Sequence, residues 1–254
     1  MARSNRSRVP AVSRPRYRVV VTDVDGTLTG PDRRLDARAM HAVRWLEAHG
    51  IPVVLATGNV LPIALALHRS LGLSGPIVAE NGGLVYRKVD GADQVERLAH
   101  RPVALAAYRA LLAEGVPVRR LFTDRWRETE VAIEATVPLS RVRRVLARRK
   151  IRVQSIGTGY AIHLMERGSG KLPALRAALR PMGLRVSDCV VLGDGDNDAG
   201  MLRASGFGVS FASGSEMARS AARYVARASF AEGFVEGLKA SGILLPSGSL
   251  PGGN

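Results

Sequence analysis

Asp23-Val24-Asp25-Gly26-Thr27, which follows the apolar run Val19-Val20-Val21, is the stretch that decides the fold. The β-branched run predicts a buried strand, and Gly26 lets the backbone turn sharply after it. Ligands of an open parallel sheet bind beyond the carboxyl ends of its strands, where this turn would lie. Two neighbouring carboxylates repel each other unless a proton or a cation intervenes. Asp23 and Asp25 therefore indicate a divalent metal, and Mg²⁺ prefers oxygen ligands of this kind.

A second acidic turn follows an apolar run much later in the chain. Residues 190–192 predict a strand, and Gly193-Asp194-Gly195-Asp196-Asn197-Asp198 comes directly after it. If both strands belong to one parallel sheet, Asp23, Asp194 and Asp198 are placed to share one Mg²⁺. The second turn lacks the spaced glycine and the final glutamate of an EF-hand. A turn that uses Asp and Gly for local hydrogen bonds would explain one cluster but not the pair.

Strands and helices alternate on both sides of a central block. Residues 51–56 and 76–79 predict two further strands around a helix at 60–71, and the pattern resumes after Gly170. This rhythm implies a parallel sheet with right-handed crossovers. The turn Thr57-Gly58-Asn59 opens the first of these helices, and free N–H groups at a helix start favour an anion. Thr57 and Gly58 are therefore candidates for phosphate binding, although Thr and Asn are also ordinary helix caps.

The central block has a different pattern. Its alternating strands and amphipathic helices predict a mostly antiparallel sheet with helices on one face. We therefore expect an α/β fold with a Rossmann-like parallel-sheet core and an inserted α+β cap domain. The expected divisions are a disordered basic tail at 1–16, the core at 17–82 and 167–242, the cap at 83–166 and a mobile tail at 243–254.

A carboxylate beside a metal suits phosphoryl transfer. Asp23 would attack phosphorus and form an aspartyl-phosphate, which water later cleaves. Asp25 would protonate the departing alkoxide and then activate that water. Lys171, which follows Gly168-Ser169-Gly170, would stabilise the charge that spreads over the equatorial oxygens. Taken alone, Lys171 would be interpreted as a surface helix lysine.

The net charge of +15 raises a competing hypothesis, a basic module that binds nucleic acid. The basic clusters lie in the N-terminal tail and on a helix at 140–150, and few aromatic residues accompany them. Nucleic acid is therefore disfavoured, and a small phosphorylated substrate is the expected partner. No run of residues is apolar enough to suggest a membrane span and no signal peptide is visible, so a cytoplasmic location is expected. Cys189 alone cannot form an intrachain disulfide, and a homodimer is left open.

These motifs resemble, in order, the four motifs of the haloacid dehalogenase superfamily of phosphatases. They are Asp-x-Asp-Gly-Thr at 23–27, Thr57, Lys171 and Gly-Asp-Gly-x-Asn-Asp at 193–198. The inserted block is similar to the α/β cap of the Cof-type branch, and Glu80-Asn81-Gly82-Gly83 is similar to the sequence that enters that cap. The modest size of the insertion and the short core most resemble the archaeal phosphoglycolate phosphatases.

The resemblance implies a role for each matching residue. Asp23 would be the nucleophile and a metal ligand, and Asp25 the acid and base whose backbone carbonyl also binds Mg²⁺. Thr57 and Lys171 would bind phosphate. The remaining roles are metal binding by Asp194 and Asp198 and support by Asn197.

The resemblance also implies a substrate, 2-phosphoglycolate, which would be hydrolysed to glycolate and phosphate. Hydrolysis of a sugar phosphate is the alternative. A substrate that bears a carboxylate would require an arginine or backbone donors from the cap. Arg125 and Arg127 are the candidates for that arginine.

Overall fold

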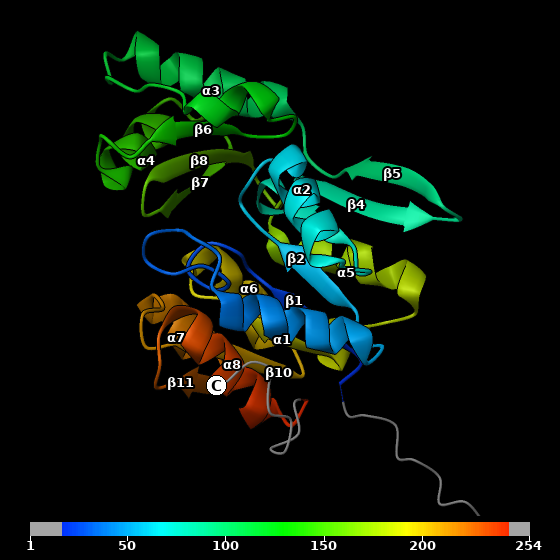
Figure 1. Cartoon of the computed structure of the whole chain (residues 1–254). Helices are drawn as coiled ribbons and strands as arrows, with labels where there is room; N and C mark the ends of the chain where they lie inside the picture. The colour runs from blue at the N-terminus through cyan, green and yellow to red at the C-terminus, as the bar shows by residue number, and fades with distance from the viewer. Residues whose placement is uncertain (1–16, 244–254) are drawn as a thin grey trace, which may run out of the picture.

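An eight-stranded sheet forms the centre of the computed structural model, which describes residues 17–243 (Figure 1). Its strand order is β11-β10-β9-β1-β2-β3-β4-β5, and the six strands from β11 to β3 run parallel. The strands are β1 (Val19–Thr22), β2 (Val53–Ala56), β3 (Ile77–Ala79), β4 (Leu84–Val89), β5 (Ala92–Arg97), β9 (Cys189–Leu192), β10 (Phe207–Phe211) and β11 (Tyr224–Ala226). The expected α/β fold with a parallel-sheet core is confirmed.

Helices cover both faces of the parallel part of the sheet. Those on one face are α1 (Ala37–Ala48), α2 (Leu61–Leu71) and α8 (Phe230–Ser241), and those on the other are α5 (Lys171–Leu179), α6 (Ala199–Ala204) and α7 (Glu216–Ala221). Successive side chains of a strand point to opposite faces. Accordingly, Val20 packs in the first cluster, whereas Val19 and Val21 pack in the second. A strand buried on both faces is continuously apolar, which is why β1 contains no charged residue.

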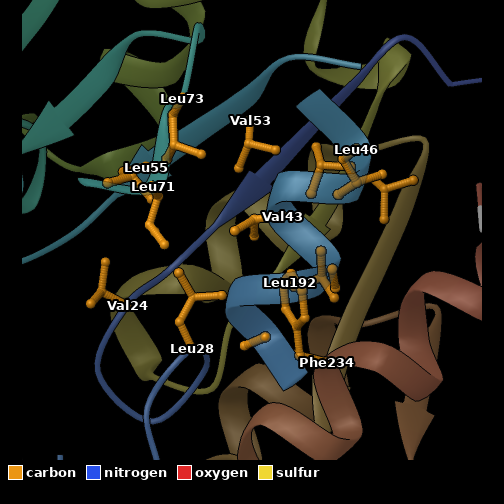
Figure 2. Close-up of a cluster of buried hydrophobic side chains, with 14 of the residues drawn as sticks. Val24, Leu28, Val43, Leu46, Val53, Leu55, Leu71, Leu73, Leu192 and Phe234 are labelled. Atoms are coloured by element: carbon orange, nitrogen blue, oxygen red, sulfur yellow. The ribbon is translucent and has the colours of Figure 1, made fainter. Parts of the chain in front are cut away.

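The first apolar cluster packs directly behind the Asp23 turn. Figure 2 shows Val43 and Leu46 of α1 beside the strand residue Val53, with Phe234 of α8 near Leu192. All five side chains are fully buried. This packing fixes the strand ends from which the acidic turns emerge.

A second, three-stranded sheet lies above the core. It pairs β6 (Val131–Glu134), β8 (Ala161–Glu166) and β7 (Val153–Thr158) in antiparallel order, and α3 (Arg101–Ala113) and α4 (Leu139–Arg148) pack against it. In Figure 1 the strands lie between these two helices and the core. Val142, Val145 and Leu146 of the basic helix α4 are buried, so this helix packs through an apolar stripe.

The hairpin of β4 and β5 was not expected. It continues the core sheet in antiparallel direction, with Ile77 of β3 opposite Tyr86. β5 is mostly exposed and polar and therefore lacked an alternating pattern. The predicted boundary at residue 83 precedes this hairpin, and the division into domains stays a prediction.

The predicted tails fall almost wholly outside the described range, which excludes residues 1–16 and 244–254. Within the described range, every helix is too short or too polar to cross a lipid bilayer.

Candidate active site

The two acidic turns leave the sheet side by side. β1 pairs in parallel with β9, and Thr22 lies opposite Leu192 at the end of both strands. Gly26 permits the close approach of the turns, because its φ is 83° and a Cβ there would come within 2.3 Å of Oδ2 of Asp194. Thr27 adds a direct link, since its Oγ1 donates to Oδ1 of Asp194 at 3.3 Å.

Lys171 and the three predicted metal-binding aspartates form one cluster. One carboxylate oxygen each from Asp23, Asp194 and Asp198 lies within 4.8 Å of the others. Nζ of Lys171 donates to Oδ1 of Asp23 at 2.6 Å and to Oδ1 of Asp198 at 2.7 Å. The start of α5 therefore delivers a cation into the cluster, and Lys171 is fully buried rather than a surface residue.

Burial and mutual repulsion shape the electrostatics of this cluster. Burial, together with the charges of Asp198 and Asp194, holds the pKa of Asp23 well above its usual range against the opposing effect of Lys171. Burial and the charge of Asp198 raise the pKa of Asp194 to about 6. Burial lowers the pKa of Lys171, but the two carboxylates raise it more, so the ammonium group stays protonated. The negative charge left beside Lys171 is stabilised further by a cation.

The donor set fits a divalent metal ion. The three aspartates offer hard oxygen ligands, which Mg²⁺ and similar cations prefer over nitrogen or sulfur. The single positive charge of Lys171 does not neutralise three carboxylates that lie this close together, and a divalent cation would supply the remaining charge. The cluster can therefore hold a divalent metal.

Asp25 points to the other side of the turn. Nδ2 of Asn59 donates to its Oδ2 at 2.7 Å, and the guanidinium of Arg33 lies 3.3 Å from its Oδ1. The side chain keeps about a third of its surface exposed. Asp25 thus lies beside the cluster of Lys171 and the three aspartates without joining it. A general acid that protonates a leaving group would require such a position.

The predicted phosphate-binding residues occupy different positions. Gly58 lines the cavity described below. Thr57 is buried, and its Oγ1 accepts a hydrogen bond from the backbone N–H of Asn59 at 3.0 Å. Lys171 lies at the carboxylate cluster as described above.

A cavity of about 460 Å³ opens over both acidic turns. Asp23, Asp25 and Asp194 line its floor, and the β7–β8 hairpin, with Thr158 and Tyr160, lines its other side. The cavity therefore lies between the core and the three-stranded sheet. Its size is typical of small-molecule sites.

A buried polar chain, not foreseen from the sequence, links the core to the upper sheet. Nδ2 of Asn197 donates to Oδ1 of Asn81 at 2.9 Å, and Nδ2 of Asn81 donates to Oε2 of Glu130 at 3.1 Å. Nδ1 of His163 lies 2.9 Å from Oε1 of Glu130. Burial raises the pKa of Glu130, but the charges of His163 and Arg127 outweigh it and hold that pKa below the usual range.

The turn at Asn81 and Gly82 allows this series of polar contacts to form. Asn81 adopts a left-handed φ of 52°, and Gly82 follows with a φ of 97°. A Cβ at Gly82 would come within 2.1 Å of the carbonyl oxygen of Gly170. The turn therefore packs directly against the segment that leads into Lys171. The motif Glu80-Asn81-Gly82-Gly83 was the available signal, but nothing in it indicated Glu130 as a partner.

Neither cap arginine suggested from the sequence lines the cavity. Arg125 lies over the ring of Phe122, 4.1 Å from its centroid. Arg127 is buried, forms an ion pair with Glu130 and donates to the carbonyl oxygen of Gly58 at 3.0 Å. Arg127 therefore links the upper part of the molecule to the turn that contains Gly58.

The geometry and the order of these groups match a known family. The family model described as haloacid dehalogenase-like hydrolase matches residues 20–111 and 141–238. The chain belongs to the haloacid dehalogenase-like hydrolase family. Its matched segments contain the candidate catalytic, phosphate-binding and metal-binding residues, including those of the two acidic turns, whereas Arg125 and Arg127 lie between the two segments.

Several proteins similar to this chain are archaeal. The chain is 36% identical to the phosphoglycolate phosphatase of Methanothermobacter thermautotrophicus, over 87% of this chain and 97% of that protein. It is 38% identical to the phosphoglycolate phosphatase of Methanopyrus kandleri, over 85% of this chain and 93% of that protein. A crystal structure from Thermoplasma acidophilum superimposes with a TM-score of 0.79 at 25% identity, over 90% of this chain and 99% of that one. This haloacid dehalogenase-like hydrolase is therefore a phosphatase of the superfamily.

Proposed function

We propose that the chain is a Mg²⁺-dependent phosphate monoester hydrolase that converts 2-phosphoglycolate to glycolate and phosphate. The observation that supports this most is the placement of Asp23, Asp194, Asp198 and Lys171 in one cluster, of which Asp23 and Asp194 line the floor of the cavity. Such a cluster combines a nucleophile, metal ligands and a fixed positive charge, which together meet the needs of phosphoryl transfer.

The two aspartates of the first turn divide the chemistry. One carboxylate oxygen of Asp23 attacks phosphorus, the bond to the ester oxygen breaks, and an aspartyl-phosphate forms. Asp25 gives its proton to the departing alkoxide and then takes a proton from the water that cleaves the aspartyl-phosphate. The hydrogen bond from Asn59 supports this role by orienting the Asp25 carboxylate.

The remaining groups bind the phosphoryl oxygens. Lys171 places a positive charge beside Asp23, and Thr57 and Gly58 contribute hydroxyl and backbone donors at the start of α2. Asp23, Asp194, Asp198 and the backbone carbonyl of Asp25 would hold Mg²⁺, with Asn197 supporting them. When bound, Mg²⁺ supplies positive charge that reduces the electrostatic repulsion between the Asp23 carboxylate and the anionic phosphate. Because the cluster is largely buried, these charges act in a low-dielectric setting where they are stronger.

The choice of 2-phosphoglycolate rests on the archaeal relatives that carry this activity in their names. A sugar phosphate is the second candidate, because the cavity of about 460 Å³ is roomier than a two-carbon ester needs. The expected cytoplasmic location, the homodimer and the lack of a nucleic-acid partner stay predictions.

A panel of phosphate esters tests the proposal. Values of kcat/KM with Mg²⁺ would be compared for 2-phosphoglycolate, glucose 6-phosphate and ethyl phosphate. The proposal expects 2-phosphoglycolate to lead. A clear preference for glucose 6-phosphate would contradict the assignment of 2-phosphoglycolate as the substrate. Activity that persists in excess chelator would refute the metal-dependent mechanism.

A further inference from the structure

Arg33 holds a distinctive place in the cavity wall. Among the described residues that line the cavity, it is the one lysine or arginine. The other charged groups of the wall are mainly carboxylates, including Asp23, Asp25 and Asp194. Arg33 is therefore the one basic side chain of this wall, among the described residues, that can pair with a second anion on the substrate.

We propose that Arg33, held by Tyr160, binds the carboxylate of the substrate and so selects 2-phosphoglycolate over esters that lack this group. The inference rests on the proposed function and adds the residues that would determine specificity. It replaces the expectation that an arginine from residues 83–166 performs this task.

The backbone holds Arg33 in a tight turn. Its N–H donates to the carbonyl oxygen of Gly30 at 3.0 Å, and the N–H of Gly30 donates to the carbonyl oxygen of Arg34 at 3.0 Å. Thr29 and Leu35 pair across the base of this turn. Arg33 itself has a φ of 64°, which is uncommon for a residue other than glycine. The turn therefore aims the side chain at the cavity from a fixed base.

Tyr160 holds the guanidinium from the opposite side. The guanidinium carbon of Arg33 lies 4.1 Å from the centroid of the Tyr160 ring, a distance suited to a cation–π contact. Arg33 comes from the core and Tyr160 from the β7–β8 hairpin. The carboxylate site is thus assembled only when these two parts of the molecule meet.

The geometry of 2-phosphoglycolate fits this position. Its carboxyl carbon is two bonds, each of about 1.5 Å, from the ester oxygen that Asp25 protonates. The carboxylate must therefore lie beside the Asp25 side chain, where Arg33 already donates to Oδ1 at 3.3 Å. A guanidinium has five donors, so Arg33 can bind the substrate carboxylate while it remains near Asp25.

The other basic side chains close to this wall are already engaged. His163 lines the cavity, but Nδ1 contacts Glu130 and Nε2 contacts Thr158. The guanidinium of Arg127 is buried beside Glu130. The side chain of Arg33 is half exposed, so its guanidinium remains accessible to a ligand while it contacts Asp25 and Tyr160.

The test compares two esters that differ in one group. 2-Phosphoglycolate carries a carboxylate, and 2-hydroxyethyl phosphate carries a hydroxymethyl group in its place. The wild-type enzyme should prefer the first by about 10- to 100-fold in kcat/KM, the range expected for losing a hydrogen bond to a charged group. In Arg33→Gln this ratio should fall to within about 3-fold of unity, and Arg33→Lys should restore part of it because a point charge replaces the bidentate fork.

The ratio separates specificity from catalysis. Arg33 also contacts Asp25, so any rate loss common to both esters reports that contact, while the change in ratio reports the carboxylate. Arg34→Gln removes the same charge from an exposed neighbour that pairs with Asp32, and it should leave the ratio unchanged. Tyr160→Leu should lower the ratio, because the guanidinium loses the ring that holds it.

The outcomes distinguish the two proposals. If the wild-type enzyme prefers 2-phosphoglycolate and Arg33→Gln keeps that preference, the inference about Arg33 is wrong and the proposed function stands. If the wild-type enzyme shows no preference for the carboxylate ester, both the substrate assignment and the role of Arg33 are overturned.

Discussion

Nζ of Lys171 lies 2.6 Å from Oδ1 of Asp23, although 148 residues separate the two in the sequence. The contact exists because α5 begins at Lys171, whose side chain reaches Asp23 at the residue that follows β1. Both side chains are buried, and Asp198 binds the same ammonium group. Two distant segments, one before and one after the three-stranded sheet, thus meet at the proposed nucleophile.

Removing the buried cation should destabilise the fold. Lys171→Met leaves Asp23 and Asp198 without their counter-ion, and breaking a buried ion pair typically costs about 3–5 kcal/mol. We expect the free energy of unfolding, measured by urea titration in the presence of chelator, to fall by this amount. In the presence of Mg²⁺ the free energy of unfolding should fall by less. Lys239→Met alters an exposed lysine of α8 and serves as the control. An unchanged unfolding midpoint in Lys171→Met would contradict the account of the cluster.

Replacing the proposed nucleophile should abolish turnover and keep the fold. Asp23→Asn has nearly the same shape but cannot form the acyl-phosphate, so kcat should fall by at least about 10³-fold. Circular dichroism should show an unchanged fold. Near-native hydrolysis by this variant would assign the attack to another group.

Metal binding can be measured without activity. A ligand that binds only the folded state raises its stability with concentration, so Tm should rise as Mg²⁺ is added to the wild-type protein. Asp194→Asn should largely remove this rise, whereas Asp196→Asn, in the same turn but outside the carboxylate cluster, should retain it. If both variants kept the full rise in Tm, Asp194 would be excluded as a ligand.

The Glu130 network predicts a pH-dependent contribution to stability. The folded-state pKa of Glu130 lies below its usual value of 4.5, so its ionised form stabilises the fold above that pH. This contribution is lost as the pH falls through the lower folded-state pKa. Glu130→Gln should therefore cost about 3–5 kcal/mol near neutral pH, because Arg127 loses its buried partner.

The difference in the free energy of unfolding between wild type and Glu130→Gln, measured across pH, separates the contribution of Glu130 from that of other carboxylates. The difference between wild type and Glu130→Gln should shrink as the pH falls below about 5. Glu134→Gln, at the end of the strand that begins directly after Glu130 and partly exposed, is the matched control. A difference that grows toward low pH would show the opposite sign of the pKa shift.

The parallel core was predictable because its signals are local. The apolar run before Asp23 and the turn at Gly26 together specify a buried strand and a tight exit, and β1 forms there. The acidic turn ending at Asp198 carries the same signature after β9. Once both strands lie in one parallel sheet, their ends must meet at one edge, so the acidic cluster followed from the topology.

The upper wall of the site could not be predicted in the same way. Arg33 resembles the many other arginines of the chain until the turn at Gly30 and the ring of Tyr160 define its position. Glu130 and Asn81 meet across 49 residues through side chains alone. Such contacts depend on how the three-stranded sheet sits over the core, and no short stretch of sequence encodes that placement.

The hydrolysis of 2-phosphoglycolate tests the central claim most directly. Purified enzyme would be assayed for phosphate release from 2-phosphoglycolate and from glucose 6-phosphate, each with Mg²⁺ and with excess chelator. The account predicts a higher kcat/KM for 2-phosphoglycolate and loss of both activities in chelator. A higher kcat/KM for glucose 6-phosphate, or hydrolysis that is unaffected by chelator, would contradict it.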